Sequence, residues 1–467
     1  MTAVVKRGLA LAASVLLFTL GLATAAQAAP GGLPSSFEWS SSGVLVSPQP
    51  DAQHDIVSIK DPTVVRHDGK WHVFATVADT SGGWNLTYLS FTDWDEADTA
   101  EQHHLDTTAI GEGYRAAPQV FYFEPEQRWY LVFQTGVPSY STTTDISDPD
   151  SWSAPRNFQE EMPPIIADNI GDGYWVDFWV TCDAAMCYLF SSDDNGHLYR
   201  AETSVAEFPN GFSNTQIALE DDRNDLFEAS NVYRVKGSDT YLLIVEAIGA
   251  EGRRYFRSWT SDSIDGSWTP LAATESEPFA GAANVTFPSG RWTEDISHGE
   301  MLRAGVDQTM RIDPCDMRYL YQGMDPSAGG EYSQLPWRLG LLTQTNSPCD
   351  SDDPDPDPDP DPDPGDPAAR CEADFRVAND WGSGFQAEVT VRNAGDAAID
   401  GWQVSWPAAG WSVDSLWNGS LTADGSTVTV DNASWNGRIE PGSSASFGFT
   451  ATGTSAVPET ACTAETG

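Results

Sequence analysis

The sequence predicts an all-β protein with two folded parts, a five-bladed β-propeller and a small β-sandwich. Short aromatic and β-branched runs alternate with polar turns, and helical periodicity is almost absent. A unit made of a strand, a polar turn and a returning aromatic strand recurs along the first 349 residues. A Pro-Asp repeat then precedes a final segment that two cysteines bracket. These three observations separate a large repeating body from a compact C-terminal module.

The first 29 residues have the features of a secretory signal peptide. The basic pair Lys6-Arg7 precedes an apolar stretch (residues 9–22), and Ala26-Gln27-Ala28 fits a cleavage site. No other stretch is long and apolar enough to span a bilayer. We therefore expect a secreted, extracellular protein.

The charge of the chain excludes two classes of partner. Its 467 residues include 24 basic and 69 acidic side chains, which gives a net charge of -45. Nucleic acids and anionic membranes would repel such a chain. A neutral partner such as a polysaccharide fits better, and the 18 Trp and 14 Tyr provide rings that stack on sugars. We expect the protein to be a monomer.

The repeat in the body predicts the blades of a propeller. The aromatic residues that open the returning strands recur at intervals of roughly 50–80 residues, and they are Trp71, Trp129, Tyr188, Tyr241 and Tyr319. The least regular unit is the last, which runs from 310–312 to 319–321. The strand at 337–343 is expected to pair with residues 37–39 and close the ring. A β-sandwich is the alternative architecture.

Four polar residues enter these units at similar offsets from the returning aromatics: Asp61, Gln119, Asp177 and Glu228. In a propeller they would occupy equivalent places on the inner strands and converge on the central axis. Pro62 is expected to bias the backbone of Asp61 towards extended conformations. Each residue alone also fits a turn or a bulge, but three carboxylates at matched places favour a site.

Three carboxylates around one axis suit glycoside hydrolysis. One carboxylate must be ionised to activate water, and another must stay protonated to donate to the leaving oxygen. Asp177 and Glu228 are flanked by apolar residues, which makes them candidates for raised pKa values. A separation of about 6.5–9.5 Å indicates inversion, and about 5–5.5 Å indicates retention. The sequence leaves the separation of Asp61 and Glu228 open.

The body resembles α-L-arabinofuranosidases of glycoside hydrolase family 62 over almost its whole length. The matching motifs are Ser58-Ile59-Lys60-Asp61-Pro62-Thr63, Ala117-Pro118-Gln119-Val120, Val176-Asp177-Phe178-Trp179-Val180, Leu226-Phe227-Glu228-Ala229-Ser230 and Asp295-Ile296-Ser297-His298-Gly299-Glu300. The resemblance implies a five-bladed propeller and an inverting mechanism. Asp61 would be the general base, Glu228 the general acid, and Asp177 the residue that tunes and orients the acid. The implied reaction releases single arabinofuranosyl side chains, α-1,2 or α-1,3 linked, from arabinoxylan.

The same motifs suggest further contacts in the site. Lys60 would reach the arabinose hydroxyls, and Gln119 would form a polar wall. Glu246 interrupts an apolar strand, so it binds sugar or pairs with an arginine. Tyr332 is a candidate for stacking on the xylan chain. By the resemblance, His298 would help hold a hydrated, structural calcium ion near the axis, with a purely structural histidine as the alternative. No cofactor is expected to be required.

The C-terminal segment resembles a family 2 carbohydrate-binding module, a β-sandwich. Trp381, Trp417 and Trp435 lie among small polar residues, which suits exposed loops, whereas Trp402 alternates with polar residues as a core strand residue does. Three exposed indoles would lie on a cellulose chain and anchor the protein to cellulose.

The expected boundaries are a signal peptide (1–29), a propeller (30–349), a stiff Pro-Asp linker (350–370) and the module (371–467). An even number of cysteines in an oxidising compartment predicts three disulfides. Cys371 and Cys462 bracket the module and are expected to pair. Cys182 with Cys187 can clip a hairpin, which leaves Cys315 with Cys349, and this part of the connectivity stays open.

Two alternatives to the arabinofuranosidase remain. One is a related five-bladed glycosidase, either a β-xylosidase or an arabinanase. The other is a propeller that binds sugar without catalysis.

Overall fold

The structure is a computed structural model that describes residues 32–349, 371–393, 398–407, 411–423, 427–433, 435–440, 443–453, 458 and 460–465. The expected signal peptide and linker lie outside the described residues. The described chain forms two compact units, one ending at residue 349 and one starting at residue 371. No helix in the described ranges is both long and apolar enough to cross a membrane.

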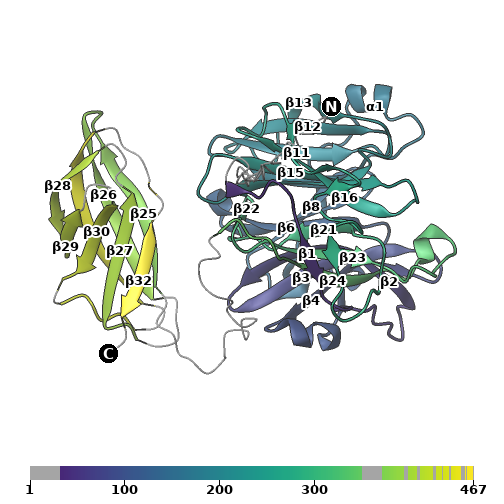
Figure 1. Cartoon of the computed structure of the whole chain (residues 1–467), viewed down its shortest axis with the longest axis horizontal. Coiled ribbons are helices and arrows are strands. Elements are labelled where there is room, and N and C mark those ends of the chain that lie inside the picture. The colour runs from purple at the N-terminus through teal and green to yellow at the C-terminus, as the bar shows by residue number, and fades with distance from the viewer. Residues whose placement is uncertain are drawn as a thin grey trace, which may run out of the picture. The chain divides into compact units, whose positions relative to one another are not determined.

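The first unit, the body, is built from five main β-sheets, numbered I to V in chain order (Figure 1). Sheet I contains β2 (Ile56–His67), β3 (Lys70–Asp79), β4 (Trp84–Phe91) and β5 (His103–His104). Sheet II contains β6 (Ala116–Phe123), β7 (Arg128–Gln134), β8 (Pro138–Thr143) and β9 (Arg156–Asn157). Sheet III contains β10 (Val176–Cys182), β11 (Met186–Ser192), β12 (His197–Ser204) and β13 (Ser213–Glu220).

Sheets IV and V each combine a meander with strands from elsewhere in the chain. Sheet IV contains β14 (Glu228–Val235), β15 (Tyr241–Ile248), β16 (Arg254–Ser261), β17 (Thr269–Pro270) and β22 (Arg311–Ile312). Sheet V contains β21 (Ser297–Met301), β23 (Arg318–Gly323), β24 (Arg338–Gln344), β1 (Trp39–Ser41) and β20 (Val285–Thr286). A small ribbon, β18 (Ala273–Thr274) with β19 (Glu277–Pro278), and one α-helix, α1 (Pro164–Asn169), complete the described body.

The strands of the body are buried along most of their length, because neighbouring sheets cover both of their faces. In β3, every residue from Trp71 to Ala78 is buried, so the strand is a nearly continuous apolar run without alternation. Aromatic rings fill the space between sheets. Trp179 of sheet III meets Tyr233 of sheet IV edge-on, with ring centroids 5.4 Å apart. Aromatic packing between sheets therefore accounts for much of the core.

The N-terminal strand completes the last sheet. β1 pairs antiparallel with β24, with Trp39 opposite Gln344 and Ser41 opposite Leu342. This confirms the pairing expected between residues 37–39 and the strand at 337–343. The expected start of the fifth unit is wrong. The strand at 311–312, β22, pairs in parallel with β14 of sheet IV, and the first strand of sheet V is instead β21. The polar sequence Ser297-His298-Gly299-Glu300 hides this strand, because it faces the centre of the body rather than an apolar core.

Each sheet carries a β-bulge in its first strand, at the same place. The five bulges contain Asp61, Ala117, Asp177, Ala229 and His298. The first four of these residues have positive φ angles of 48°, 50°, 57° and 53°. A positive φ costs a non-glycine residue roughly 1–2 kcal/mol, so surrounding interactions must hold it.

Hydrogen bonds between sheets hold these bulges in a closed cycle, which we call the bulge ring. A side chain on the second strand of one sheet accepts the backbone N–H of the bulge residue in the next sheet. Thr76 accepts from Ala117 at 2.8 Å, Gln134 from Asp177 at 2.8 Å, Glu246 from His298 at 2.7 Å, and Gln322 from Asp61 at 2.6 Å. In sheet III the equivalent side chain, Ser192, does not take this role, and the Asp177 carboxylate itself accepts from Ala229 at 2.8 Å. The contact between Gln322 and Asp61 joins sheet V back to sheet I.

The C-terminal unit consists of two four-stranded antiparallel sheets (Figure 1). One contains β25 (Cys371–Asp380), β26 (Gly384–Asn393), β31 (Ser444–Thr452) and β28 (Ser412–Trp417). The other contains β29 (Gly419–Ala423), β30 (Thr427–Asn432), β27 (Gly401–Pro407) and β32 (Ala461–Glu465). Buried Phe385, Ala387, Val389 and Val391 alternate along β26 with more exposed residues, as a strand with one core face requires. Trp402 is buried in this core, as expected.

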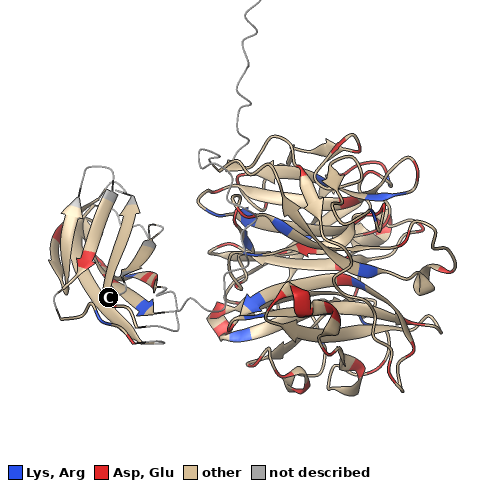
Figure 2. Ribbon diagram, turned by 60° about the horizontal axis from the view of Figure 1, so that its bottom comes forward, with Lys and Arg blue, Asp and Glu red and all other residues tan. Residues whose placement is uncertain are grey.

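The structure contains three disulfides, Cys182–Cys187, Cys315–Cys349 and Cys371–Cys462. The pair in the C-terminal unit was expected, and it joins the first strand of one sheet to the last strand of the other. Acidic side chains are spread over both units, and basic ones are few (Figure 2).

Replacing Gln322 with Ala should destabilise the body by about 1–3 kcal/mol, because it leaves the buried N–H of Asp61 without an acceptor. Thermal unfolding of the full chain would measure this loss. Gln344→Ala is a matched control, because that amide lies in the same sheet and makes only long contacts of 3.4–3.5 Å to Asn346. Equal losses in both variants would contradict a special role for the Gln322 contact.

Candidate active site

The bulge ring places five polar side chains at the floor of one cleft. The cleft has a volume of about 870 Å³. The five side chains belong to bulge residues or to the residue directly before a bulge, and they are Lys60, Asp61, Asp177, Glu228 and His298. They come from sheets I, III, IV and V. The structure therefore brings together the three carboxylates that the sequence singled out.

Asp61 is buried and held on three sides. Gln322 fixes its backbone, Lys60 Nζ lies 3.7 Å from Oδ2, and His298 Nδ1 lies 3.5 Å from Oδ1. These contacts orient the Asp61 carboxyl group at the cleft floor, where an oriented carboxylate can accept a proton from water.

Asp177 is also buried, and it faces both of the other carboxylates. Its Oδ2 accepts the backbone N–H of Ala229, the residue after Glu228, and lies 3.6 Å from His298 Nδ1. Burial raises the pKa of Asp177 well above its usual range, and the nearby charges of Glu228 and Asp61 add to the shift. A carboxyl group that keeps its proton at this place adds no negative charge beside Asp61 and Glu228. Its hydrogen bond with Ala229 also fixes the backbone next to Glu228.

Glu228 reaches the cleft from the first position of β14. Its Oε1 accepts a hydrogen bond from Arg254 Nη1 at 3.0 Å, and its side chain shares a hydrogen bond with Asp194. Burial, followed by the charges of Glu228 and Asp177, raises the pKa of Asp194 to about 9. At neutral pH Asp194 and Glu228 therefore keep a proton between their two carboxyl groups.

Sequence reasoning missed Asp194 and Arg254. Asp194 lies in Asp193-Asp194-Asn195-Gly196, which has the composition of an ordinary turn. Its φ of 52° is unusual for a residue that is 9% exposed, but a backbone angle cannot be read from sequence. Arg254 is the second of two arginines at the start of β16, and only the fold directs its side chain to Glu228. In sequence, an acidic cluster in a turn does not distinguish a residue of the site from an ordinary surface residue.

Lys60 and three aromatic rings form a wall of the cleft. Lys60 Nζ lies 3.7 Å from the centroid of the Trp84 ring and 5.0 Å from that of Tyr332. Burial opposes the charge on Lys60, but Asp61 and the other anionic groups around it raise its pKa above the usual value. Tyr114 and Tyr332 line the same cleft, and 47% of Tyr332 is exposed. Lys60 and Tyr332 therefore both line the cleft, and their roles as sugar contacts stay a prediction.

Gln119 does not share the place of the carboxylates. It lies two positions beyond its bulge residue, Ala117, and its amide bonds to both the N–H and the C=O of Val180 at 2.7 Å. It does not line the cleft. The offset from the aromatic residues misaligned it, because the bulges and turns differ in length between sheets. Gln119 instead ties sheet II to sheet III below the site.

Glu246 is an internal residue, not a wall of the cleft. It is fully buried and accepts from Arg254 Nη1 at 2.7 Å, from Ser297 Oγ at 3.0 Å and from the N–H of His298. This is the arginine pair that the sequence left as an alternative to sugar binding. Its effect on the site is indirect, because it positions Arg254 and His298.

A small cavity of about 10 Å³ lies under the cleft floor, bordered by His298, Asn231 and Ser230. The Oδ1 of Asn231 and the Oγ of Ser230 are buried without hydrogen-bond partners among the described residues. Such a cavity holds about one water molecule. Amide and hydroxyl oxygens are ligands of the type that calcium takes, and a calcium ion near His298 stays a prediction.

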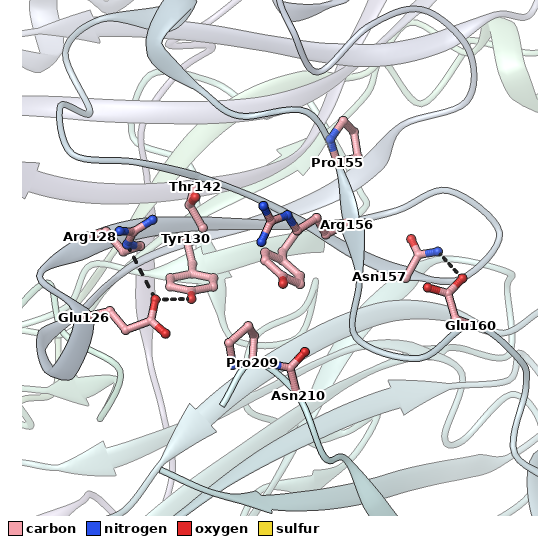
Figure 3. Close-up of a pocket in the computed structure, with 11 residues that line it drawn as sticks. Glu126, Arg128, Tyr130, Thr142, Pro155, Arg156, Asn157, Glu160, Pro209 and Asn210 are labelled. Carbon is pink, nitrogen blue, oxygen red and sulfur yellow. Dashed lines mark hydrogen bonds and ion pairs between the residues drawn. The ribbon is translucent and has the colours of Figure 1, made fainter. Parts of the chain in front are cut away.

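A second pocket lies on a different part of the body, between β7, β8, β9 and the segment at Pro209-Asn210 (Figure 3). Its volume is about 540 Å³. Its two carboxylates are already engaged, since Glu126 contacts Tyr130 and Arg128, and Glu160 contacts Asn157. They lie at opposite ends of the pocket (Figure 3). The pocket therefore lacks a free carboxylate pair, unlike the cleft.

The C-terminal unit exposes the three expected tryptophans. Trp381, Trp417 and Trp435 are 51%, 39% and 71% exposed. A Cβ at Gly448 would meet the Trp417 ring at 2.5 Å, and one at Gly384 would meet the Trp381 ring at 2.9 Å. Glycines thus let two of the indoles lie against strands β31 and β26 of one sheet.

Comparison with known proteins identifies both units. Residues 38–343 match the model of glycosyl hydrolase family 62, and residues 371–467 match a cellulose binding domain. Alpha-L-arabinofuranosidase C of Cellvibrio japonicus is 44% identical over 314 residues, which cover 66% of this chain and 47% of that protein. The chain thus spans about half the length of this relative.

Solved structures agree with the sequence matches. The catalytic domain of a GH62 alpha-L-arabinofuranosidase from Coprinopsis cinerea is 60% identical, with a TM-score of 0.67, and the match covers 68% of this chain and all of that one. A GH62 hydrolase in complex with xylotriose is 54% identical, with a TM-score of 0.65 over 66% of this chain and 98% of that one. The chain carrying this cleft therefore belongs to glycosyl hydrolase family 62.

Proposed function

We propose that the protein is an α-L-arabinofuranosidase that releases single arabinofuranosyl side chains from arabinoxylan. The observation that carries the proposal is the convergence of Asp61, Asp177 and Glu228 from three sheets on one cleft. The relative from Cellvibrio japonicus and the structure from Coprinopsis cinerea both carry the name of this activity. The aromatic wall around Lys60 supports a sugar substrate, and the bound xylotriose of a related hydrolase supports a xylan backbone.

The proposed mechanism is hydrolysis with inversion. Asp61, beside Lys60 and His298, takes a proton from the attacking water. Glu228, beside protonated Asp194, donates a proton to the departing xylose oxygen. Asp177 keeps its own proton through burial, which limits charge repulsion in the site and holds the backbone next to Glu228. Two carboxyl groups acting as base and acid supply the two proton transfers that inversion requires.

The architecture that we propose is a five-bladed β-propeller, with sheets I to V as its blades. The cyclic order of the bulge-ring hydrogen bonds supports this, because they run from each sheet to the next and return from Gln322 to Asp61. In this arrangement the bulges surround the central axis. A structural calcium ion at the axis would be held by His298 and by water. No cofactor takes part in the proposed proton transfers.

We further propose a secreted protein that the C-terminal unit anchors to cellulose. The match to a cellulose binding domain and the three exposed tryptophans support the anchor. The proposed boundaries are 30–349 for the propeller and 371–467 for the module, joined by the Pro-Asp linker. We also propose that the chain acts as a monomer.

Time-resolved NMR of arabinoxylan digestion tests the function directly. We expect arabinose as the released sugar, the β-anomer as its first form, and loss of the α-1,2 or α-1,3 branch signals. Release of xylose would favour a β-xylosidase, and release from linear arabinan alone would favour an arabinanase. No released sugar together with intact binding would favour a silent sugar-binding propeller.

Asp61→Asn and Glu228→Gln should each lower kcat by roughly 10²–10⁴-fold, because each removes one proton transfer. The Glu228→Gln loss should shrink on an aryl arabinofuranoside, whose acidic leaving group needs no proton, and the Asp61→Asn loss should persist. Asp68→Asn is the matched control, since this residue, with an 88% exposed side chain, shares the positive φ (48°) and lies in the turn that follows the same strand. Recovery of both variants on the aryl substrate would contradict the assigned roles.

Asp194→Asn should make stability less dependent on pH. The folded protein keeps the Asp194 proton up to a pKa of about 9, whereas the unfolded chain loses it near the ordinary aspartate pKa of 3.8. Between these values the folded state binds more protons, so rising pH destabilises the wild type. The Tm of the wild type should therefore fall more steeply from pH 5 to 8 than that of the variant. Parallel Tm profiles would contradict the protonated state of Asp194.

Replacing Trp381, Trp417 and Trp435 together with Ala should abolish retention on microcrystalline cellulose and leave hydrolysis of soluble arabinoxylan unchanged. Each exposed indole stacks on a sugar ring, a contact that Ala cannot make. A pull-down assay measures retention. Trp402 is unsuitable as a control because it is buried, so Leu421→Ala, at a 40% exposed residue of the same unit, serves instead. Full retention of the triple variant would refute the stacking role.

A further inference from the structure

A cluster of two histidines and two aspartates lies outside the cleft. It forms where the loop before β2 meets the outer edge of sheet I. Asp51 and His54 belong to the loop (residues 47–55), His104 ends β5, and Asp106 follows in the 3₁₀ turn Leu105–Thr107. Nothing in the proposed hydrolysis uses these four side chains.

Three of the side chains present ligand atoms to one point. A ligand atom from each of Asp51, His54 and His104 lies within 4.8 Å of the others. Asp51 Oδ2 lies 2.9 Å from His54 Nδ1 and 3.9 Å from His104 Nε2, and the two rings have centroids 4.0 Å apart. Tetrahedral zinc ligands at 2.0–2.1 Å from the metal are about 3.3 Å apart, a spacing that lies between the two separations from Asp51 Oδ2.

The neighbouring groups are those that orient metal ligands. His54 Nε2 lies 3.2 Å from Asp106 Oδ2, so an ion bound at Nδ1 would place the ring proton on Nε2, facing this carboxylate. Asp51 Oδ1 accepts the backbone N–H groups of Gln53 and His54, both at 2.7 Å, which leaves Oδ2 directed at the two rings. Metal-binding histidines commonly have such a carboxylate behind them.

Two polar atoms of the cluster lack a partner. His104 is 8% exposed, and its Nδ1 has no hydrogen-bond partner in the described part of the chain. The same holds for Asp106 Oδ1. A buried polar atom without a partner is costly unless a ligand or water supplies one.

We propose that Asp51, His54 and His104 bind a divalent transition-metal ion of the zinc class, with Asp106 orienting His54. Two imidazoles and one carboxylate select this class, because calcium and magnesium take oxygen ligands. A groove of about 320 Å³, lined in part by His54, His104 and Asp106, gives the ion access from solvent. The ion fastens the loop at 47–55 to the outer edge of sheet I.

The test uses the full chain after chelator treatment, with Zn²⁺ and Co²⁺ as probes. Calorimetry should show one Zn²⁺ site, and the Tm of the body should rise by about 3–6 °C at a free Zn²⁺ concentration about 100 times the Kd. Co²⁺ at the same site should give visible d–d absorption. Zn²⁺ that leaves the Tm unchanged would overturn the proposal and assign the cluster to a metal-free ion pair between His54 and the two aspartates.

Matched variants separate this site from adventitious binding. His54→Asn and His104→Asn should each lose the Tm rise and the Co²⁺ absorption. His103→Ala, at the adjacent exposed histidine, should retain both. The acidic linker is present in every variant, so weak binding there stays constant across the series. Equal Zn²⁺ responses in all variants would overturn the assignment, whether or not the protein hydrolyses arabinoxylan.

Discussion

The hydrogen bond that each sheet gives to the bulge of the next is the constraint on which the body depends. These hydrogen bonds stabilise four positive φ angles in non-glycine residues. They also connect the five sheets, whose strands have no backbone pairing with one another at the bulges. The bulge ring also determines what the cleft contains. A side chain at a bulge, or one residue before it, leaves the strand at the end of the ladder and reaches the cleft floor. The ring is thus both the closure of the fold and the frame of the site.

In sheet III, one carboxylate belongs both to the bulge ring and to the candidate active site. The acceptor there is not a second-strand side chain but the carboxylate of Asp177. One oxygen of Asp177 accepts from Ala229 while the group faces Glu228 and Asp61. Several carboxylates buried together are unfavourable unless some keep their protons. The raised pKa values of Asp177, Asp194 and Glu246 lower the number of buried negative charges and so reduce this cost. Asp61 and Glu228 remain available for proton transfer.

The sequence predicted most strands of the sheets, but it predicted less well which residues of different sheets occupy equivalent positions. Aromatic returning strands and the motifs around Asp61, Asp177 and Glu228 were sufficient to locate four sheets and the carboxylates. Counting back from the aromatics put Gln119 among them and treated Glu228 as equivalent to Asp61, whereas Glu228 matches Lys60. The number of residues between two positions depends on the lengths of the turns and bulges between them. Only the strand register of the structure shows which residues are equivalent. Asp194, Arg254 and strand β21 escaped for a related reason: polar residues that face the centre resemble turn residues in sequence.

The pairing of β1 with β24 has a consequence for how the body forms. The two strands are about 300 residues apart in sequence, and they lie in the sheet that also supplies Gln322. Contacts between such distant segments form slowly, because the intervening chain must first be ordered. The backbone of Asp61 then acquires its final partner only when the last sheet docks. Activity should therefore report the slowest folding step, and a chain with four sheets formed should be inactive although most of its core is in place.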